Sequence, residues 1–302
     1  MLECVYCGLK SGAILMLNGY KTMRVITRLC VLLLLSGMAM HSKAHQRAAS
    51  AMYLGNEAIL VSGVGGKVLF DPFFHKNFGV YQLVPDEIKR AIIQGEVPYD
   101  NINAIVVSHA HGDHFAAEDV LSYLLAFPRT KLIGPKQAVD QVLALLKAHH
   151  NAKQIGSQMH SIDLVLGDAP VSVEAAMMTF EAVRIPHSGW PGRADIQNIV
   201  FRVTLGNGAD GASTVMHMGD ADADDGHYLP YKQHWQERET DMAFPPYWFY
   251  ASAEGNDILQ EIINARQSVG VHVPVVVPRN LKNSAHDYFS RPGEQRNIGH
   301  QH

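Results

Sequence analysis

A group of potential metal ligands follows the apolar run 104–107. His109, His111, Asp113 and His114 occupy four of six consecutive positions. Neutral imidazole and carboxylate groups are the ligands that Zn²⁺ and similar divalent metals bind. His109 and His111 lie two positions apart, so an extended turn allows both to reach the same ion. Asp113 and His114 lie where the chain bends towards a helix, so they point elsewhere and can serve a second ion.

A histidine-rich surface loop is the alternative interpretation of this stretch. The chain has 17 His among 302 residues, so some of them cluster by chance. Four ligand-type side chains directly after a buried-strand pattern are a different case, because a strand and a helix then hold the ligands on short, rigid connections. The pattern therefore favours a metal site.

The elements on either side must position this turn. Residues 58–71 contain two apolar runs around a Gly-rich turn, which predicts a β-hairpin. Helical spacing is found at 85–94, 116–127 and 136–149, and a short strand is expected at 131–133. The ligand turn thus lies within an alternation of strands and helices.

The apolar period becomes two from Val171 onward, which is typical of strands. Strands are expected at 179–185, 198–205, 213–218 and 241–244. A helix is expected at 256–266, with Asn256 as its N-cap. The apolar run 269–274 is expected to form a further strand, and the polar tail from Ser290 is expected to be frayed.

Two aromatic segments each have two interpretations. Residues 73–84 can form a flap over the ligand turn or a loop that packs on the core. Residues 245–250 can line an apolar substrate pocket or pack within the core.

Composition limits the classes of function. With 47% hydrophobic residues, the chain can bury a full core. The net charge is -4 and no block of like charge is present, which argues against a nucleic-acid partner and favours a small-molecule substrate. The three cysteines all precede residue 45, so the rest of the chain does not depend on disulfides.

The N-terminal region has the pattern of a secretory signal. Lys21, Arg24 and Arg28 precede the apolar run 29–40, and the small residues Ser42 and Ala44 follow. The run is too short for a comfortable membrane span. An uncleaved anchor is the alternative, but no stable membrane anchor is expected after the signal is removed.

These features predict three parts of the chain. Met23 directly precedes the basic region, so residues 1–22 are interpreted as an upstream extension and 23–44 as the signal peptide. Residues 45–302 are expected to form a single domain that is periplasmic or secreted. The sequence leaves the oligomeric state open.

The stretch from His109 to His114 resembles the HxHxDH signature of the metallo-β-lactamase-fold metal-dependent hydrolases. The resemblance implies an α/β fold, the αββα sandwich, with two mixed β-sheets, helices outside and metals at one sheet edge. It also requires further ligands downstream, each after a strand. His187, Asp220 and His272 occupy such places in order.

The resemblance assigns these residues to two ions. The implied ligands are His109, His111 and His187 for the first ion, Asp113, His114 and His272 for the second, and Asp220 for both. Asp71 is expected to support a ligand imidazole by accepting a hydrogen bond. His286 is the alternative to His272. The alternatives to Asp220 are Asp222, Asp224 and Asp225.

The activity implied by the resemblance is hydrolysis with two divalent ions, most simply Zn²⁺, with iron or manganese as alternatives. A metal-bridging hydroxide would attack an ester, lactone or phosphodiester, and Asp113 would act catalytically by moving a proton to the leaving group. The general pattern is most similar to the lactonase- and phosphodiesterase-like branch. A periplasmic metallo-β-lactamase, an iron-dependent oxygen- or sulfur-handling enzyme and a non-catalytic metal-binding protein are the alternatives.

Overall fold

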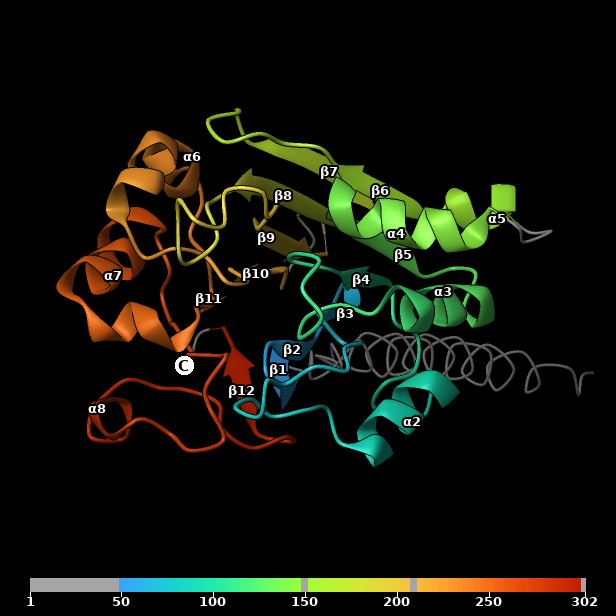
Figure 1. The fold of residues 1–302 in the computed structure, drawn as a ribbon, viewed down its shortest axis with the longest axis horizontal. Helices are drawn as coiled ribbons and strands as arrows, with labels where there is room; N and C mark the ends of the chain where they lie inside the picture. The colour runs from blue at the N-terminus through green and yellow to red at the C-terminus, as the bar shows by residue number, and fades with distance from the viewer. Residues whose placement is uncertain (1–48, 148–151, 207–210, 300–302) are drawn as a thin grey trace, which may run out of the picture. The chain divides into compact units, whose positions relative to one another are not determined.

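Two β-sheets lie at the centre of the computed structural model, which describes residues 49–147, 152–206 and 211–299 (Figure 1). The first sheet consists of β1 (Ala49–Gly55), β2 (Ala58–Gly63), β3 (Gly66–Phe70), β4 (Ala104–Val106), β5 (Lys131–Pro135), β6 (Met159–Ile162) and β12 (Gln295–Ile298), in the order β12-β1-β2-β3-β4-β5-β6. The second consists of β7 (Val171–Ala175), β8 (Met178–Arg184), β9 (Ile199–Leu205), β10 (Ser213–His217) and β11 (Met242–Phe244), in the order β11-β10-β9-β8-β7.

Both sheets are mixed. In the first sheet, β3, β4, β5 and β6 pair in parallel, whereas β12, β1, β2 and β3 pair antiparallel. In the second, β10 and β11 are parallel and the other pairs are antiparallel. Parallel neighbours end at the same edge of a sheet, and the candidate site is built there.

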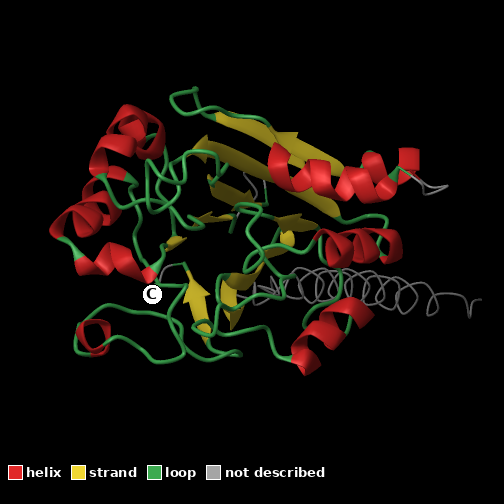
Figure 2. Ribbon diagram, viewed as in Figure 1, coloured by secondary structure: helices red, strands yellow, loops and turns green. Residues whose placement is uncertain are grey.

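Helices cover the outer face of each sheet (Figure 2). On the first sheet they are α2 (Asp86–Gln94), α3 (Ala117–Ala126), α4 (Lys136–Leu146) and α5 (Ala152–Gly156). The later helical segments are the 3-10 turns η1 (Asp225–His227), η2 (Leu229–Tyr231) and η3 (Tyr247–Ala251), the π-helix η4 (Ile258–Ile262), and α6 (Lys232–Gln236), α7 (Ala253–Asp257) and α8 (Arg279–Lys282). Side chains from η2, η3, η4 and α6 pack on the second sheet.

Alternation along the strands explains the layers. Ile59 and Val61 of β2 point between the sheets, where they pack with Phe201 of β9. Leu60 of β2 points to the opposite face, towards α3 and α4. Val200 of β9 likewise faces the second set of helices. Because successive strand residues point to opposite faces, each sheet is buried on both sides, and the expected αββα sandwich is confirmed.

The C-terminal tail differs from the expectation of a frayed end. Residues 295–298 form β12, which pairs antiparallel with β1 at the edge of the first sheet. Ile298 is buried in the core between the sheets. The segment is polar because only one of its four residues faces that core. Its composition therefore gave no indication of a strand.

Two further expectations in the last third were wrong in detail. The helix expected from Asn256 begins at Ala253, and the hydroxyl of Ser252 caps it by accepting a hydrogen bond from Gly255 N at 2.9 Å. The run 269–274 makes only isolated bridges instead of a continuous strand. One reason is that His272 has a φ of 57°, which interrupts an extended backbone.

The proposed extension 1–22 and signal 23–44 lie outside the described residues, as does the boundary at residue 45. Within the described parts of the chain, no helix is long and apolar enough to span a bilayer.

Candidate metal centre

The ligand turn lies at the edge where β3 and β4 end side by side. These strands are parallel, and Phe70 pairs with Val106. The chain therefore delivers Asp71 and the turn after β4 to the same place. Ser108 N donates to Asp71 Oδ1 at 2.7 Å, and its hydroxyl donates to Asp71 Oδ2 at 2.5 Å. The Asp71 carboxylate thus holds the start of the turn.

The second sheet contributes two ligands by the same logic. β8 and β10 both pair antiparallel with β9, so they run in the same direction and end at one edge. His187 follows β8 and Asp220 follows β10. Their loops meet through a bridge between His187 and Ala221 and a hydrogen bond from Ser188 N to Asp220 O of 2.7 Å.

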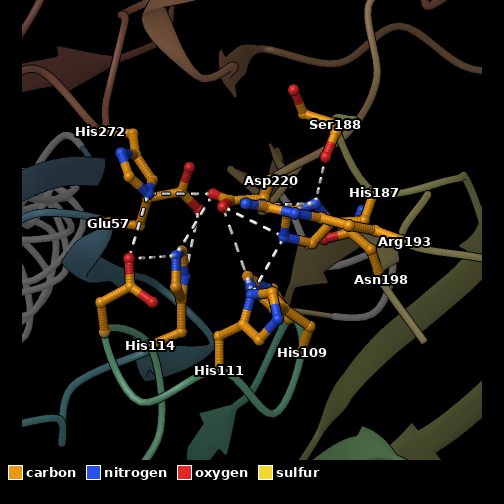
Figure 3. A network of polar contacts seen from close by, with 12 residues as sticks. Glu57, His109, His111, His114, His187, Ser188, Arg193, Asn198, Asp220 and His272 are labelled. Atoms are coloured by element: carbon orange, nitrogen blue, oxygen red, sulfur yellow. Dashed lines mark hydrogen bonds and ion pairs between the residues drawn. The ribbon is translucent and has the colours of Figure 1, made fainter. Parts of the chain in front are cut away.

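The first candidate cluster consists of His109, His111, His187 and Asp220 (Figure 3). His111 Nδ1 lies 3.1 Å from both His109 Nε2 and His187 Nε2. Asp220 Oδ2 lies 3.2 Å from His187 Nε2 and 4.0 Å from His109 Nε2. With metal–nitrogen bonds of about 2.0–2.1 Å, tetrahedral ligand atoms lie roughly 3.3 Å apart. The spacing therefore suits one ion.

Hydrogen bonds of the outer nitrogens leave the inner nitrogens free. His187 Nδ1 donates to Ser188 O at 2.7 Å, and His109 Nδ1 donates to the Ser108 hydroxyl at 3.0 Å. Nε2 of His187 and Nε2 of His109 therefore carry no hydrogen, and the lone pair of each faces His111. A hydrogen on His111 Nδ1 can serve only one of these two lone pairs, whereas a cation between the three nitrogens is bound by all of them, so the donor set fits a bound metal.

The second candidate cluster consists of Asp113, His114 and His272, with Asp220 adjacent. Figure 3 shows His114, His272 and Asp220 of this group. Asp220 Oδ1 lies 3.2 Å from His114 Nε2 and 3.1 Å from His272 Nε2. Asp113 Oδ2 lies 3.7 Å and 3.6 Å from the same two nitrogens. Asp220 thus directs one oxygen to each cluster, which is the geometry of a bridging carboxylate.

Several buried polar atoms here lack a hydrogen-bond partner. They are Asp113 Oδ1, His114 Nε2, Asp220 Oδ1 and His272 Nε2. A buried polar atom without a partner is unfavourable, so these four atoms, which belong to the residues of this cluster and to Asp220, fit a bound cation.

Burial and charge act in opposite directions on these groups. Burial disfavours the charged imidazolium and lowers the pKa of His109, which keeps it in the neutral form that binds metal. Burial acts the same way on His272, but the carboxylates of Asp220 and Asp113 together outweigh it and raise the pKa of His272 to about 9. The Asp220 carboxyl is itself buried, and the adjacent His272 and His114 hold its pKa well below the usual range.

The rivals considered for the downstream ligands lie elsewhere. His286 stacks on Tyr250, with ring centroids 4.2 Å apart. Asp224 accepts from Gly226 N and caps η1, and Asp222 accepts from Asp224 N. Asp225 is only half-buried and lies in η1.

Glu57 is a site residue that the sequence interpretation missed. It is fully buried, and its Oε2 lies 3.8 Å from His114 Nδ1 and 3.6 Å from His217 Nε2. Burial raises its pKa well above the usual range. Glu57 lies in the tight turn between β1 and β2, where a charged residue is normally taken as exposed, so local pattern carries no signal for it.

The metal ligands line one wall of a cavity of about 390 Å³. Phe78 and Tyr81 line another wall, and the Tyr81 ring lies edge-on to His272 with centroids 4.0 Å apart. Phe73 and Phe74 are buried in the core. The segment 73–84 is therefore divided: Phe73, Phe74 and Val84 pack in the core, and Phe78 and Tyr81 between them border the cavity.

The second aromatic segment lies behind the ligands. Phe249 is buried against the second sheet. Trp248 donates to Ala221 O at 3.0 Å, and its ring lies 5.3 Å from that of His272. Residues 245–250 are absent from the lining of this cavity, so the structure favours core packing.

Comparisons with known proteins identify the family of the chain. A family model described as a beta-lactamase superfamily domain matches residues 51–246. A comparison with curated proteins gives no match.

Solved structures share the fold at low sequence identity. A protein from Veillonella parvula, described as a possible metal-dependent hydrolase, is 14% identical with a TM-score of 0.53, and the alignment covers 83% of this chain and 100% of that one. Igni18, a metallo hydrolase from Ignicoccus hospitalis, is 14% identical with a TM-score of 0.52, over 84% of this chain and 100% of that one. A mutant of the CmlA β-hydroxylase is 12% identical with a TM-score of 0.50 over 83% of this chain, which spans 54% of its length.

Proposed function

The chain belongs to the beta-lactamase superfamily, and we propose that it is a hydrolase that works with two divalent metal ions, in the first place Zn²⁺. The substrate class is a small ester, lactone or phosphodiester. The observation that carries this proposal is the position of Asp220. One of its oxygens faces each of two adjacent clusters of His and Asp side chains.

The candidate site residues have two roles, metal binding and proton transfer. His109, His111 and His187 would hold one ion, Asp113, His114 and His272 the other, with Asp220 between them. When bound, the two ions supply an acidified water and a Lewis acid for the attacked oxygen. Asp113 Oδ1 has no hydrogen-bond partner, so it can accept a proton from the attacking water and deliver it to the leaving group. Phe78 and Tyr81 border the cavity.

An iron-dependent enzyme is the second candidate. Two imidazoles with two carboxylates at the second cluster suit iron as well as zinc. The likeness in fold to the CmlA β-hydroxylase mutant adds support at the level of the scaffold only. Metal identity distinguishes the two candidates.

Metal analysis of the purified protein, combined with a leaving-group panel, tests the proposal. Two equivalents of zinc with turnover of an ester, lactone or phosphodiester support it, whereas bound iron without hydrolysis favours the second candidate. His111→Ala should remove the first ion and all hydrolysis while the fold is kept. Full activity in this variant contradicts the ligand set.

A second pair of variants tests the choice between the two late histidines. His272→Ala should lose one of the two ions, because its Nε2 faces Asp113 and Asp220. His286→Ala should retain both, because its ring only stacks on Tyr250. The reverse result would transfer the role to His286.

We also propose export to the periplasm or outside the cell. Its support is the basic, apolar and small-residue pattern at 21–44. Mass analysis of the protein from the periplasmic fraction should show a chain that begins after residue 44, and an intact cytoplasmic chain contradicts the proposal.

A further inference from the structure

Arg193 lies at the wall of the cavity that the candidate metal ligands line. It is the lining residue with a permanent positive charge; the other lining residues are Phe78, Tyr81, His111, Asp113, Asp195, Ile196, Asp220 and His272. Its Nη1 lies 3.5 Å from His187 Nδ1, so the guanidinium is one imidazole ring away from the first cluster (Figure 3).

The guanidinium has no acceptor of its own among the described residues. His187 Nδ1 already donates to Ser188 O at 2.7 Å, so it carries its hydrogen and has no lone pair for Arg193. The contact at 3.5 Å is therefore a close approach of two donors rather than a hydrogen bond. No carboxylate within the described parts of the chain lies at ion-pair distance from Arg193, and Asp195 on the same wall is no exception.

The loop that carries Arg193 is held firmly. Gln137 and Gln197 exchange hydrogen bonds, with each backbone N–H donating to the other's side-chain oxygen at 3.1 and 2.9 Å. Gln137 also donates to Asp195 O at 2.6 Å, and Arg184 donates to Ala194 O at 3.2 Å. These bonds lie after Arg193, and the bond from Ser188 N to Asp220 O holds the loop before it. The backbone that carries this exposed arginine is therefore fixed on both sides, which lowers the entropy cost of binding a ligand.

The stem of Arg193 has a defined support as well. A Cβ built on Gly189 would lie 3.5 Å from Arg193 Cδ and 3.6 Å from Nε, so the stem runs over the glycine. Gly189 has a φ of 91°, a conformation that other residues rarely adopt. The turn after His187 thus directs both the ligand imidazole and the guanidinium to the cavity.

We propose that Arg193 is a specificity residue that binds an anionic group of the substrate, a carboxylate or a phosphate oxygen, beside the scissile bond. This inference rests on the proposed metal-dependent hydrolase function. An arginine fork matches the two oxygens of either anion, and charge-assisted hydrogen bonds are the strong ones. With two divalent ions bound, the ions and Arg193 outweigh the carboxylates of Asp113, Asp195 and Asp220, so the cavity carries excess positive charge and an anion is favoured there.

Direct binding is the first test, because it does not require turnover. Phenylphosphonate and benzoate, with benzamide as the neutral probe, are titrated calorimetrically into the metal-loaded protein. Arg193→Ala should weaken binding of one or both anions by about 10- to 100-fold, and Arg193→Lys should weaken it less. Which anion responds more strongly distinguishes phosphate from carboxylate recognition. Arg129→Ala is the matched control, since Arg129 is exposed at a different cavity.

Kinetics provide the second test. Arg193→Ala should raise KM for anionic substrates with kcat nearly unchanged, because the residue binds without taking part in the proton transfer. A neutral ester should be hydrolysed as in the wild type.

Two outcomes overturn the inference. One is that Arg193→Ala binds both anions as tightly as wild type, which would mean that any anion is held by the ions alone. The other is that wild type binds neither anion. A protein that binds anions through Arg193 but hydrolyses no substrate would instead contradict the proposed function, so the two failures are distinct.

Discussion

His114 Nδ1 lies 2.9 Å from Asp71 Oδ2, so a carboxylate at the end of one strand orients a candidate ligand that follows the next strand. The same carboxylate accepts from the backbone and hydroxyl of Ser108. Asp71 therefore links Ser108 at the start of the turn to His114 at its end. The lone pair of His114 Nε2 then faces Asp113 and Asp220.

Replacing the Asp71 carboxylate tests this coupling. Asp71→Asn offers one acceptor oxygen and an NH₂ group where three donors converge, so at least one donor loses its partner. Metal affinity should fall by about 10- to 100-fold, as for other supports of metal-bound histidine. Competition with a chelator measures this. Asp168→Asn is the control, because Asp168 accepts a single backbone N–H that an amide oxygen can also accept; an equal loss in both variants would rule out a specific role.

Gly219 positions Asp220, and a methyl group there should displace it. Gly219 has a φ of 55°, and an added Cβ would lie 2.5 Å from Asn198 Oδ1 and 2.7 Å from Ser108 Cβ. Asn198 is held by its own bond to Met218 O at 3.2 Å and cannot yield easily. Gly219→Ala should therefore lower both metal affinity and stability.

Gly293→Ala separates strain from the clash at Gly219. Gly293 also has a positive φ, of 92°, but its Cβ would meet nothing within 4 Å. It should cost only about 1–2 kcal/mol of unfolding free energy and leave metal binding unchanged. Denaturant unfolding and metal titration of the two variants check this, and equal behaviour would show that the contact with Asn198 is unimportant.

Glu181 and Arg202 form a buried pair that should govern stability in acid. Arg202 Nε and Nη2 donate to the two Glu181 oxygens at 2.8 and 2.9 Å. Burial opposes the carboxylate charge, but the hydrogen bonds and charge of Arg202, together with Arg238, outweigh it and lower the pKa of Glu181. Glu181→Gln leaves a buried cation and should cost about 3–5 kcal/mol near neutral pH.

The sign of the pH dependence follows from that lowered pKa. The stabilisation is fully present above the unfolded pKa of a glutamate, about 4.3, and is lost as pH falls through the lower folded value. Urea unfolding of wild type and Glu181→Gln should therefore converge at acidic pH. Asp140→Asn, which removes an exposed pair with Lys136, should match wild type throughout. A difference between wild type and Glu181→Gln that is independent of pH contradicts the assignment.

Local sequence determined much of this protein. Residue types within one turn identified His109, His111, Asp113 and His114, because neighbours on a short connection must lie together. Periods of two and of about four residues predicted the hairpin, α2 to α4 and the strands of the second sheet, because each pattern reflects which side chains are buried. The helix expected at 85–94 is α2, and it ends at Gly95, which has a φ of 65°.

Tertiary structure alone decided the rest. Glu57 and Arg193 reach the site from turns with ordinary polar sequences, and nothing local distinguishes them from solvent-exposed residues. His272 lies in a left-handed conformation rather than in a strand, and β12 is a polar edge segment that pairs with the distant β1. These positions depend on which strand ends meet when two sheets pack, and that is set by contacts between residues far apart in the chain.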